Sequence, residues 1–166
     1  PTSPVALPRK KANVPLLNER DAQEIRQIFA QGMTGDVQIT LFTQKSTLLT
    51  VPGREQEIEY CKTANQLLEE VSALSDRIHV TAYDIREDSA KFEEFGIEHI
   101  PAILLGGADE VRPARFYGVT SGYEFSTFIQ DILDLSTGNI ELTEATLEWA
   151  RNLQEDVHIQ VFSTPT

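Results

Sequence analysis

Cys61 is the most reactive side chain that this sequence offers, and it is the only cysteine of the chain. A thiolate can attack a disulfide, but a single cysteine cannot form an internal disulfide, which agrees with a reducing compartment. Cys61 recurs at helical spacing with apolar residues such as Ile58 and Leu68. We therefore expect a buried core cysteine. A residual redox or mixed-disulfide role is the alternative.

The other side chains that could carry chemistry lack the spacing it needs. The histidines His79, His99 and His158 are scattered among the predicted strands, with no second ligand at metal spacing, so we expect no metal site. The glycine pair at 106–107 opens no helix and lacks a phosphate-loop lysine, which argues against a nucleotide site. We expect no cofactor.

Composition excludes further classes of partner. The chain of 166 residues has 26 acidic and 14 basic residues, which gives a formal net charge of −12. Because phosphate neutralisation needs grouped lysine and arginine, neither nucleic acid nor an anionic membrane is expected as a partner. The sequence has no long apolar run and no apolar signal core near its start, so we expect a cytoplasmic protein without a membrane span.

The elements that must position Cys61 alternate along the chain. In chain order, periodicity predicts helix 19–33, strand 37–43, helix 53–75, strand 78–84, helix 89–95, strand 102–105, strand 115–119 and helix 122–135. The buried stripe of helix 19–33 is expected to hold Ala22, Ile25, Ile28, Phe29 and Met33, and that of helix 53–75 to hold Ile58, Cys61, Ala64, Leu67, Leu68, Val71 and Leu74. Gly96 is expected to end helix 89–95 as a left-handed cap, and Ser121 and Glu124 to form a capping box that opens helix 122–135. A parallel strand pair joined by a crossover helix, followed by an antiparallel pair and a closing helix, is the arrangement of the thioredoxin fold. The predicted fold class is α/β and thioredoxin-like, with a central mixed sheet flanked by helices.

An internal repeat indicates the start of a second unit. Residues 36–42 (DVQITLF) reappear as residues 156–162 (DVHIQVF), and the helical segments that precede the two copies also agree. Two copies of one strand imply two copies of one fold. We therefore divide the chain into an extended N-terminal arm at 1–16, a thioredoxin-like domain at 17–138 and the start of a second thioredoxin-like unit at 139–166.

The repeated strand needs a partner, because an isolated strand is not stable in water. We expect residues 157–162 to join an edge of the chain's own sheet, delivered there by a helix whose Trp149 face packs on the first unit. A homodimer that forms through this terminal strand is the alternative.

Three stretches carry a resemblance to a known family. They are EYCK at 59–62, FGIEHIPAILL at 95–105 and RFYGVTSGYEF at 115–125. With them, residues 17–164 resemble the first half of the glutaredoxin-like protein disulfide oxidoreductases, in which two thioredoxin-fold units stand in tandem. The N-terminal domain of alkyl hydroperoxide reductase flavoproteins is similar too, and its first unit also lacks a working cysteine pair.

The resemblance implies a degenerate active site. In this family the first cysteine of a C-x-x-C motif at a helix N-terminus attacks a disulfide, and the second resolves it. The resemblance places Cys61 at the resolving position and Ile58 at the attacking position, so the motif reads I-E-Y-C and implies no dithiol cycle. An insertion within 44–57 implies a helix that begins a turn or two before Ile58. The second unit would stop before its own C-x-x-C.

The resemblance also implies a cis peptide bond between Ile100 and Pro101. In active relatives the loop that carries this bond lies against the cysteines and accepts extended peptide. Ile100 and Pro101 are therefore candidate binding residues, and a relic of the fold is the other interpretation.

We interpret the chain as the N-terminal, redox-inactive unit of a thiol-disulfide oxidoreductase that serves cell redox homeostasis. The chain itself is predicted to be inactive, and it would support the fold or the substrate binding of a C-terminal active unit. Its expected partners are protein disulfide substrates or a partner protein. The alternatives are a non-enzymatic interaction or assembly module and weak monothiol exchange through Cys61.

Overall fold

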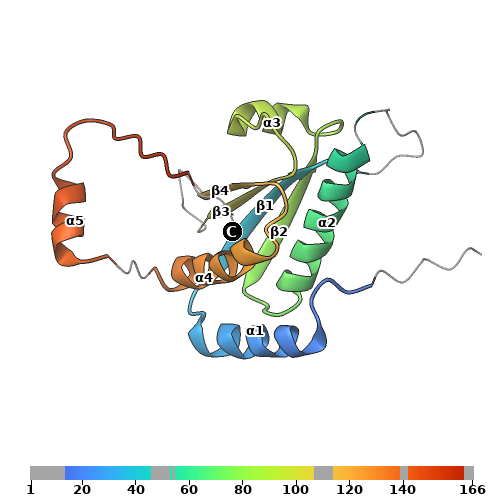
Figure 1. The fold of residues 1–166 in the computed structure, drawn as a ribbon, viewed down its shortest axis with the longest axis horizontal. Helices are drawn as coiled ribbons and strands as arrows, with labels where there is room; N and C mark the ends of the chain where they lie inside the picture. Colours follow the sequence, from blue (N-terminus) through green and yellow to red (C-terminus); the bar gives the residue numbers. More distant parts are fainter. Residues whose placement is uncertain (1–13, 46–52, 54, 107–113, 139–141, 163–166) are drawn as a thin grey trace, which may run out of the picture.

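The computed structural model describes residues 14–45, 53, 55–106, 114–138 and 142–162. The elements are, in chain order, α1 (Glu19–Gly32), β1 (Val37–Thr43), α2 (Glu55–Ser72), β2 (Ile78–Asp84), α3 (Ser89–Phe95), β3 (Ala102–Gly106), β4 (Ala114–Tyr117), α4 (Tyr123–Thr137) and α5 (Glu144–Arg151). Figure 1 shows α1 to α4 gathered around one sheet, with α5 apart from them.

The sheet has the strand order β2-β1-β3-β4. β1 and β2 are parallel and are connected through α2, whereas β3 is antiparallel to both β1 and β4. This mixed sheet flanked by helices confirms the predicted thioredoxin-like arrangement. β1 and β2 also span the predicted residues.

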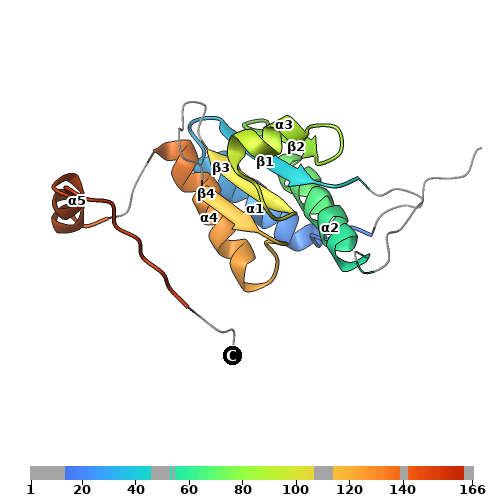
Figure 2. The ribbon, with the colours of Figure 1, turned by 90° about the horizontal axis from the view of Figure 1, so that it is seen from above.

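The core lies on both faces of β1. Val37, Ile39 and Leu41 belong to the larger buried cluster, which α1, α2 and α4 complete, whereas Phe42 belongs to a smaller cluster on the α3 side. Figure 2 shows α3 on one side of the sheet and α1, α2 and α4 on the opposite side. This strand is buried because helices cover it from both sides.

Helical periodicity predicted the α2 stripe correctly and the α1 stripe in part. The predicted apolar positions of α2 are all buried: Ile58, Cys61, Ala64, Leu67, Leu68 and Val71. In α1, Ile25 and Phe29 are buried, but Ile28 is 39% exposed at the rim of a groove between α1 and α4. The buried face of α1 is therefore narrower than the periodicity of its apolar residues predicts.

Ser136 fixes the C-terminal end of α4 to the turn before β1. Its hydroxyl accepts the N–H groups of Thr34 and Gly35, each at 3.0 Å, and donates to the Gly35 carbonyl at 2.7 Å. A Cβ on Gly35 would lie 2.9 Å from the Ser136 carbonyl oxygen, so this approach requires glycine. These hydrogen bonds fix the position of α4 relative to β1.

Helix ends were predicted less well than helix bodies. Gly96 ends α3 in the left-handed conformation at φ 61°, which confirms the expected cap. The capping box expected at Ser121 and Glu124 is wrong, because α4 begins one residue later with Gly122 as its N-cap. Gly122 has φ 68° and no side chain that could accept the first helical N–H groups.

The end of the N-terminal arm is attached to α2. The Glu70 carboxylate accepts the N–H groups of Leu16 at 3.0 Å and Leu17 at 2.8 Å. The rest of the arm at 1–13 lies outside the described residues, as do 46–52 and residue 54 of the predicted insertion.

The C-terminal segment does not pack on this body. No residue of α5 is buried, and Trp149 is 54% exposed. Residues 157–162 form no strand, and Ile159 and Phe162 are 73% and 90% exposed. The expectation that this segment joins the chain's own sheet is therefore wrong in this structure, because α5 does not dock and cannot deliver it. The division of the chain into units stays a prediction.

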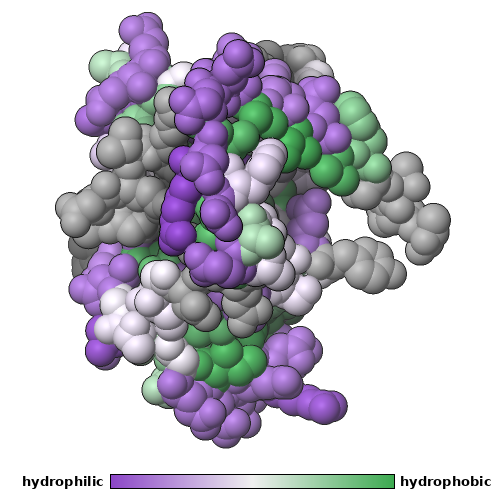
Figure 3. Space-filling view, turned by 90° about the vertical axis from the view of Figure 1, so that its left-hand side faces the viewer, coloured by the Kyte–Doolittle hydropathy of each residue, from purple (hydrophilic) through white to green (hydrophobic). Residues whose placement is uncertain are grey.

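Figure 3 views the molecule from the α5 side and shows apolar side chains exposed there among polar ones.

Within the described ranges, every helix is too short or too polar to span a membrane.

Candidate functional site

Cys61 lies in the second turn of α2. The helix begins at Glu55, so the predicted early start is confirmed: Ile58 is in the first turn, and Cys61 follows it by three residues. The unpaired N–H groups and the positive end of the helix dipole act only over the first turn. The helix terminus therefore does little to stabilise a thiolate at Cys61.

Both positions of the I-E-Y-C motif face the core. Ile58 is 7% exposed and Cys61 is 1% exposed, which agrees with the expected buried cysteine. Because residues three apart share a helix face, both side chains point toward the sheet. An approaching disulfide would have to displace part of α2 to reach the sulfur.

Burial is the largest influence on the Cys61 thiol and raises its pKa. Hydrogen bonds from the Thr43 hydroxyl and the Gln44 backbone N–H act in the opposite direction, while the carboxylates of Glu57 and Asp84 raise the pKa further. The net shift is upward, so the protonated thiol is the form that this site stabilises.

The polar residues around this thiol come from the ends of the two parallel strands. Asp84, at the end of β2, is buried and pairs in register with Thr43 of β1. Burial opposes its ionisation, but its carboxylate accepts the N–H groups of Lys45 at 2.7 Å and Arg86 at 2.9 Å, which hold its pKa below the usual value.

Sequence reasoning missed Thr43 and Asp84. Both are the last residues of predicted strands that run parallel, and the carboxyl ends of parallel strands meet at one edge of a sheet. From this rule, the sequence could have predicted that Thr43 and Asp84 lie beside each other and near the start of the helix that carries Cys61.

The Ile100–Pro101 peptide bond is cis, as expected. Phe42 pairs with Ala102 in the antiparallel register of β1 and β3, so Pro101 lies across from Thr43, at the end of β1 that Cys61 contacts. Pro101 is buried, and its carbonyl accepts the Gly118 N–H at 2.9 Å. Ile100 is half-buried and packs against the cluster on the α3 side. The fold thus brings the predicted site residues Ile58, Cys61 and Pro101 to one end of the sheet.

His79 and His158 lie apart from this end, whereas His99 directly precedes Ile100 and Pro101 in the sequence. His79 lies 3.6 Å from a carboxylate oxygen of Asp36 at the start of β1, and the rings of His99 and Tyr117 are 6.3 Å apart. His158 lies in the exposed C-terminal segment. Within the described part of the chain, His, Cys, Asp and Glu form no group that could hold a metal ion.

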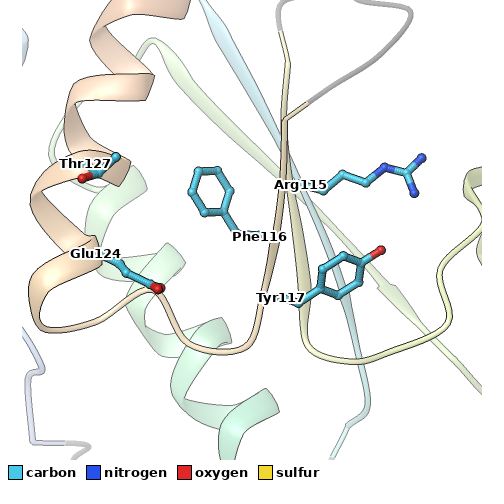
Figure 4. A pocket seen from close by; sticks show the side chains of 5 residues that line it. All are labelled: Arg115, Phe116, Tyr117, Glu124 and Thr127. Carbon is cyan, nitrogen blue, oxygen red and sulfur yellow. The ribbon is translucent and has the colours of Figure 1, made fainter. Parts of the chain in front are cut away.

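Two surface hollows lie elsewhere. One, of about 320 Å³, opens between β4 and α4, where Phe116 points toward Glu124 and Thr127 while Arg115 and Tyr117 point the other way (Figure 4). The second, of about 360 Å³, is the groove between α1 and α4. Cys61 lines neither hollow, so neither extends the I-E-Y-C site.

Comparison with solved structures identifies the fold. The chain superposes with a TM-score of 0.66 and 25% identity on a protein disulfide oxidoreductase from Aeropyrum pernix, covering 82% of this chain and 55% of that one. It also superposes with a TM-score of 0.64 and 21% identity on the alkylhydroperoxide reductase protein AhpF from Enterococcus faecalis, covering 80% and 58%. No protein-family model and no curated protein matches the sequence.

The chain spans little more than half the length of these two relatives, at 55% and 58%. Identity this low supports the fold alone, and the strand order and crossover helix of this chain are those of the thioredoxin arrangement. The chain is therefore a thioredoxin-fold protein that is similar to a protein disulfide oxidoreductase.

Proposed function

We propose that this chain is the redox-inactive, N-terminal thioredoxin-like unit of a cytoplasmic thiol-disulfide oxidoreductase. It holds or helps to present protein substrates for a unit that carries the working cysteines. Its partners are protein disulfide substrates or the neighbouring unit. The observation that supports inactivity best is the pairing of Ile58 with a buried Cys61, since a dithiol cycle needs two cysteines and access to the first of them.

The position of the motif supports the same proposal. A reactive thiol in such a site has a pKa lowered by the helix terminus or by a positive neighbour. Cys61 lies beyond the first turn, and the ionisable groups that influence it, Glu57 and Asp84, are negative. Monothiol exchange through Cys61 is disfavoured for the same reasons.

A binding role is supported by what the site retains. The Ile100–Pro101 bond is cis, and Pro101 lies at the same end of β1 as Cys61, although the thiol chemistry is missing. The exposed C-terminal segment repeats α1 and β1 in sequence, which supports a second unit beside the first.

Reduction of insulin disulfides by dithiothreitol tests inactivity directly. The chain should not accelerate precipitation of the insulin B chain above a control without protein. Cys61→Ser is the matched control, because it removes the only thiol. Turnover that exceeds the control and is lost in Cys61→Ser would show that the unit is an enzyme.

A further inference from the structure

β2 ends the sheet, with β1 on one side and no other described strand beside it. The Arg77 carbonyl accepts the Val37 N–H at 2.8 Å, and the Ile85 N–H donates to the Thr43 carbonyl at 3.0 Å, so odd-numbered residues of β2 turn their backbone groups toward β1. Backbone groups alternate in direction along a strand. The N–H and C=O groups of Val80 and Ala82 therefore point outward from the sheet.

The outer edge of β2 lacks the features that usually prevent strands from pairing. Natural edge strands are protected by lysine, proline, bulges or very short length. β2 has seven residues (IHVTAYD), with no lysine, proline or glycine. Its central residues His79, Val80, Thr81 and Ala82 are all exposed. The edge is thus long and regular, and four of its residues, Ile78, Val80, Thr81 and Tyr83, are of types that favour strands.

We propose that β2 pairs antiparallel with β2 of a second copy of this chain, with Thr81 on the two-fold axis, so that the two sheets become one. This register sets Val80 opposite the partner's Ala82, and their outward backbone groups form the hydrogen bonds of the new ladder. On the other face, His79 lies beside the partner's Tyr83, and the two Thr81 side chains meet at the axis. Aromatic and threonine cross-strand pairs stabilise antiparallel sheets.

Charge selects the same register. With Thr81 on the axis, the turn before β2, which carries the exposed Asp76, lies near the partner's turn after β2, which carries the exposed Arg86. The symmetry brings this pair of opposite charges together twice. Moving the axis to Val80 would set Asp76 against the partner's Asp84, a pair of like charges. The edge is therefore complementary to itself in backbone pattern and in charge.

The terminal residues 157–162 are the competing occupant of this edge. They repeat β1 in sequence and are exposed in the structure, which contains both this segment and the β2 edge and leaves them apart. A second copy of β2 is the occupant we assign, because it needs no docking of α5.

Sedimentation of the full chain over a range of concentrations, at physiological ionic strength, tests the pairing. Salt is needed because two copies with a net charge of −12 each repel. A reversible dimer is expected. Asp76→Arg or Arg86→Asp should weaken it roughly tenfold, because attraction becomes repulsion at two exposed contacts. The double variant should restore it, and Arg115→Asp on the opposite edge strand should leave it unchanged.

A cross-link provides a second readout of the register. Opposite residues that are not hydrogen-bonded lie close enough for a disulfide. Thr81→Cys in a Cys61→Ser background should therefore form a covalent dimer with oxidised glutathione, whereas Arg115→Cys should not. A chain that stays monomeric without this cross-link overturns the proposal. So does a dimer that ignores the charge variants but is lost when residues 157–162 are deleted.

Discussion

Alkylation of Cys61 is the most direct measure of the degenerate site. The residue is 1% exposed, so a reagent reaches the sulfur only when the first turns of α2 leave the sheet. Exposing Ile58 and Cys61 together costs about 3 kcal/mol, at about 1.5 kcal/mol or more for each buried side chain. The sulfur is then accessible in about one molecule in 150. We expect iodoacetamide to react with the native chain at least about 100-fold more slowly than with the chain unfolded in urea.

The measurement needs one matched control. Lys62→Cys in a Cys61→Ser background places an exposed thiol one residue further along the same helix. It should react at nearly the unfolded rate, and intact mass would follow both reactions. A native rate for Cys61 within about threefold of the unfolded rate would falsify the reasoning from burial.

The pH dependence tests the electrostatic part. Because the folded-state pKa of Cys61 is raised, the unfolded chain loses its thiol proton at a lower pH than the native chain. The contribution of the Cys61 thiol to the free energy of unfolding should be fully present below about pH 8.5, the pKa of a cysteine in the unfolded chain. It should fall as the pH rises toward the pKa of the folded state. Cys61→Ser should lack this decline in urea unfolding. A reactivity midpoint below about pH 7 would instead favour monothiol exchange.

Three further changes have defined outcomes. Ile58→Cys should form a disulfide with Cys61, detected as a loss of two mass units. Insulin reduction should nevertheless stay slow, because the pair lies within the helix and is buried. Activity equal to that of an active family member would contradict the placement of the insertion. Ser136→Ala should lower the free energy of unfolding by about 1 kcal/mol, because the Thr34 N–H and the Gly35 carbonyl lose their hydrogen bonds to the hydroxyl, while the Gly35 N–H keeps the Ser136 carbonyl as acceptor. Thr137→Ala should change it by less than about 0.5 kcal/mol; equal effects would refute the role of Ser136. Glu70→Gln should destabilise the chain at pH 7. The difference in stability from wild type should vanish as the pH falls through the lowered pKa of Glu70, since the stabilising charge of the carboxylate is present only above that pKa. A difference that persists at acid pH would contradict this role of the Glu70 charge.

The sequence predicted the interior of the fold well because burial leaves a strong periodic pattern. Val37, Ile39 and Leu41 alternate as a covered strand must, and β1 has the predicted bounds. The position of Cys61 on the buried stripe of α2 followed from the same reasoning. The cis bond at Pro101 could be expected only through the family resemblance, because local sequence favours the trans form.

The errors come from features that periodicity does not encode. The start of α4 depends on the backbone of Gly122, which the more familiar Ser121 capping pattern concealed. The pattern of 157–162 shows which side chains would be covered in a complete sheet, but it cannot say that a covering element is present. Thr43 and Asp84 are polar residues at strand ends, and only the sheet topology brings them to Cys61.

The exposed position of Trp149 determines what optical experiments on this chain will report. It is the chain's only tryptophan, and it lies on α5, outside both buried clusters. Its emission should therefore resemble that of a solvated indole in the native state and should change little when the sheet unfolds. Circular dichroism is the appropriate probe for the body of the molecule. A blue shift of the tryptophan emission on addition of a partner would report that the C-terminal segment has found a surface to cover it.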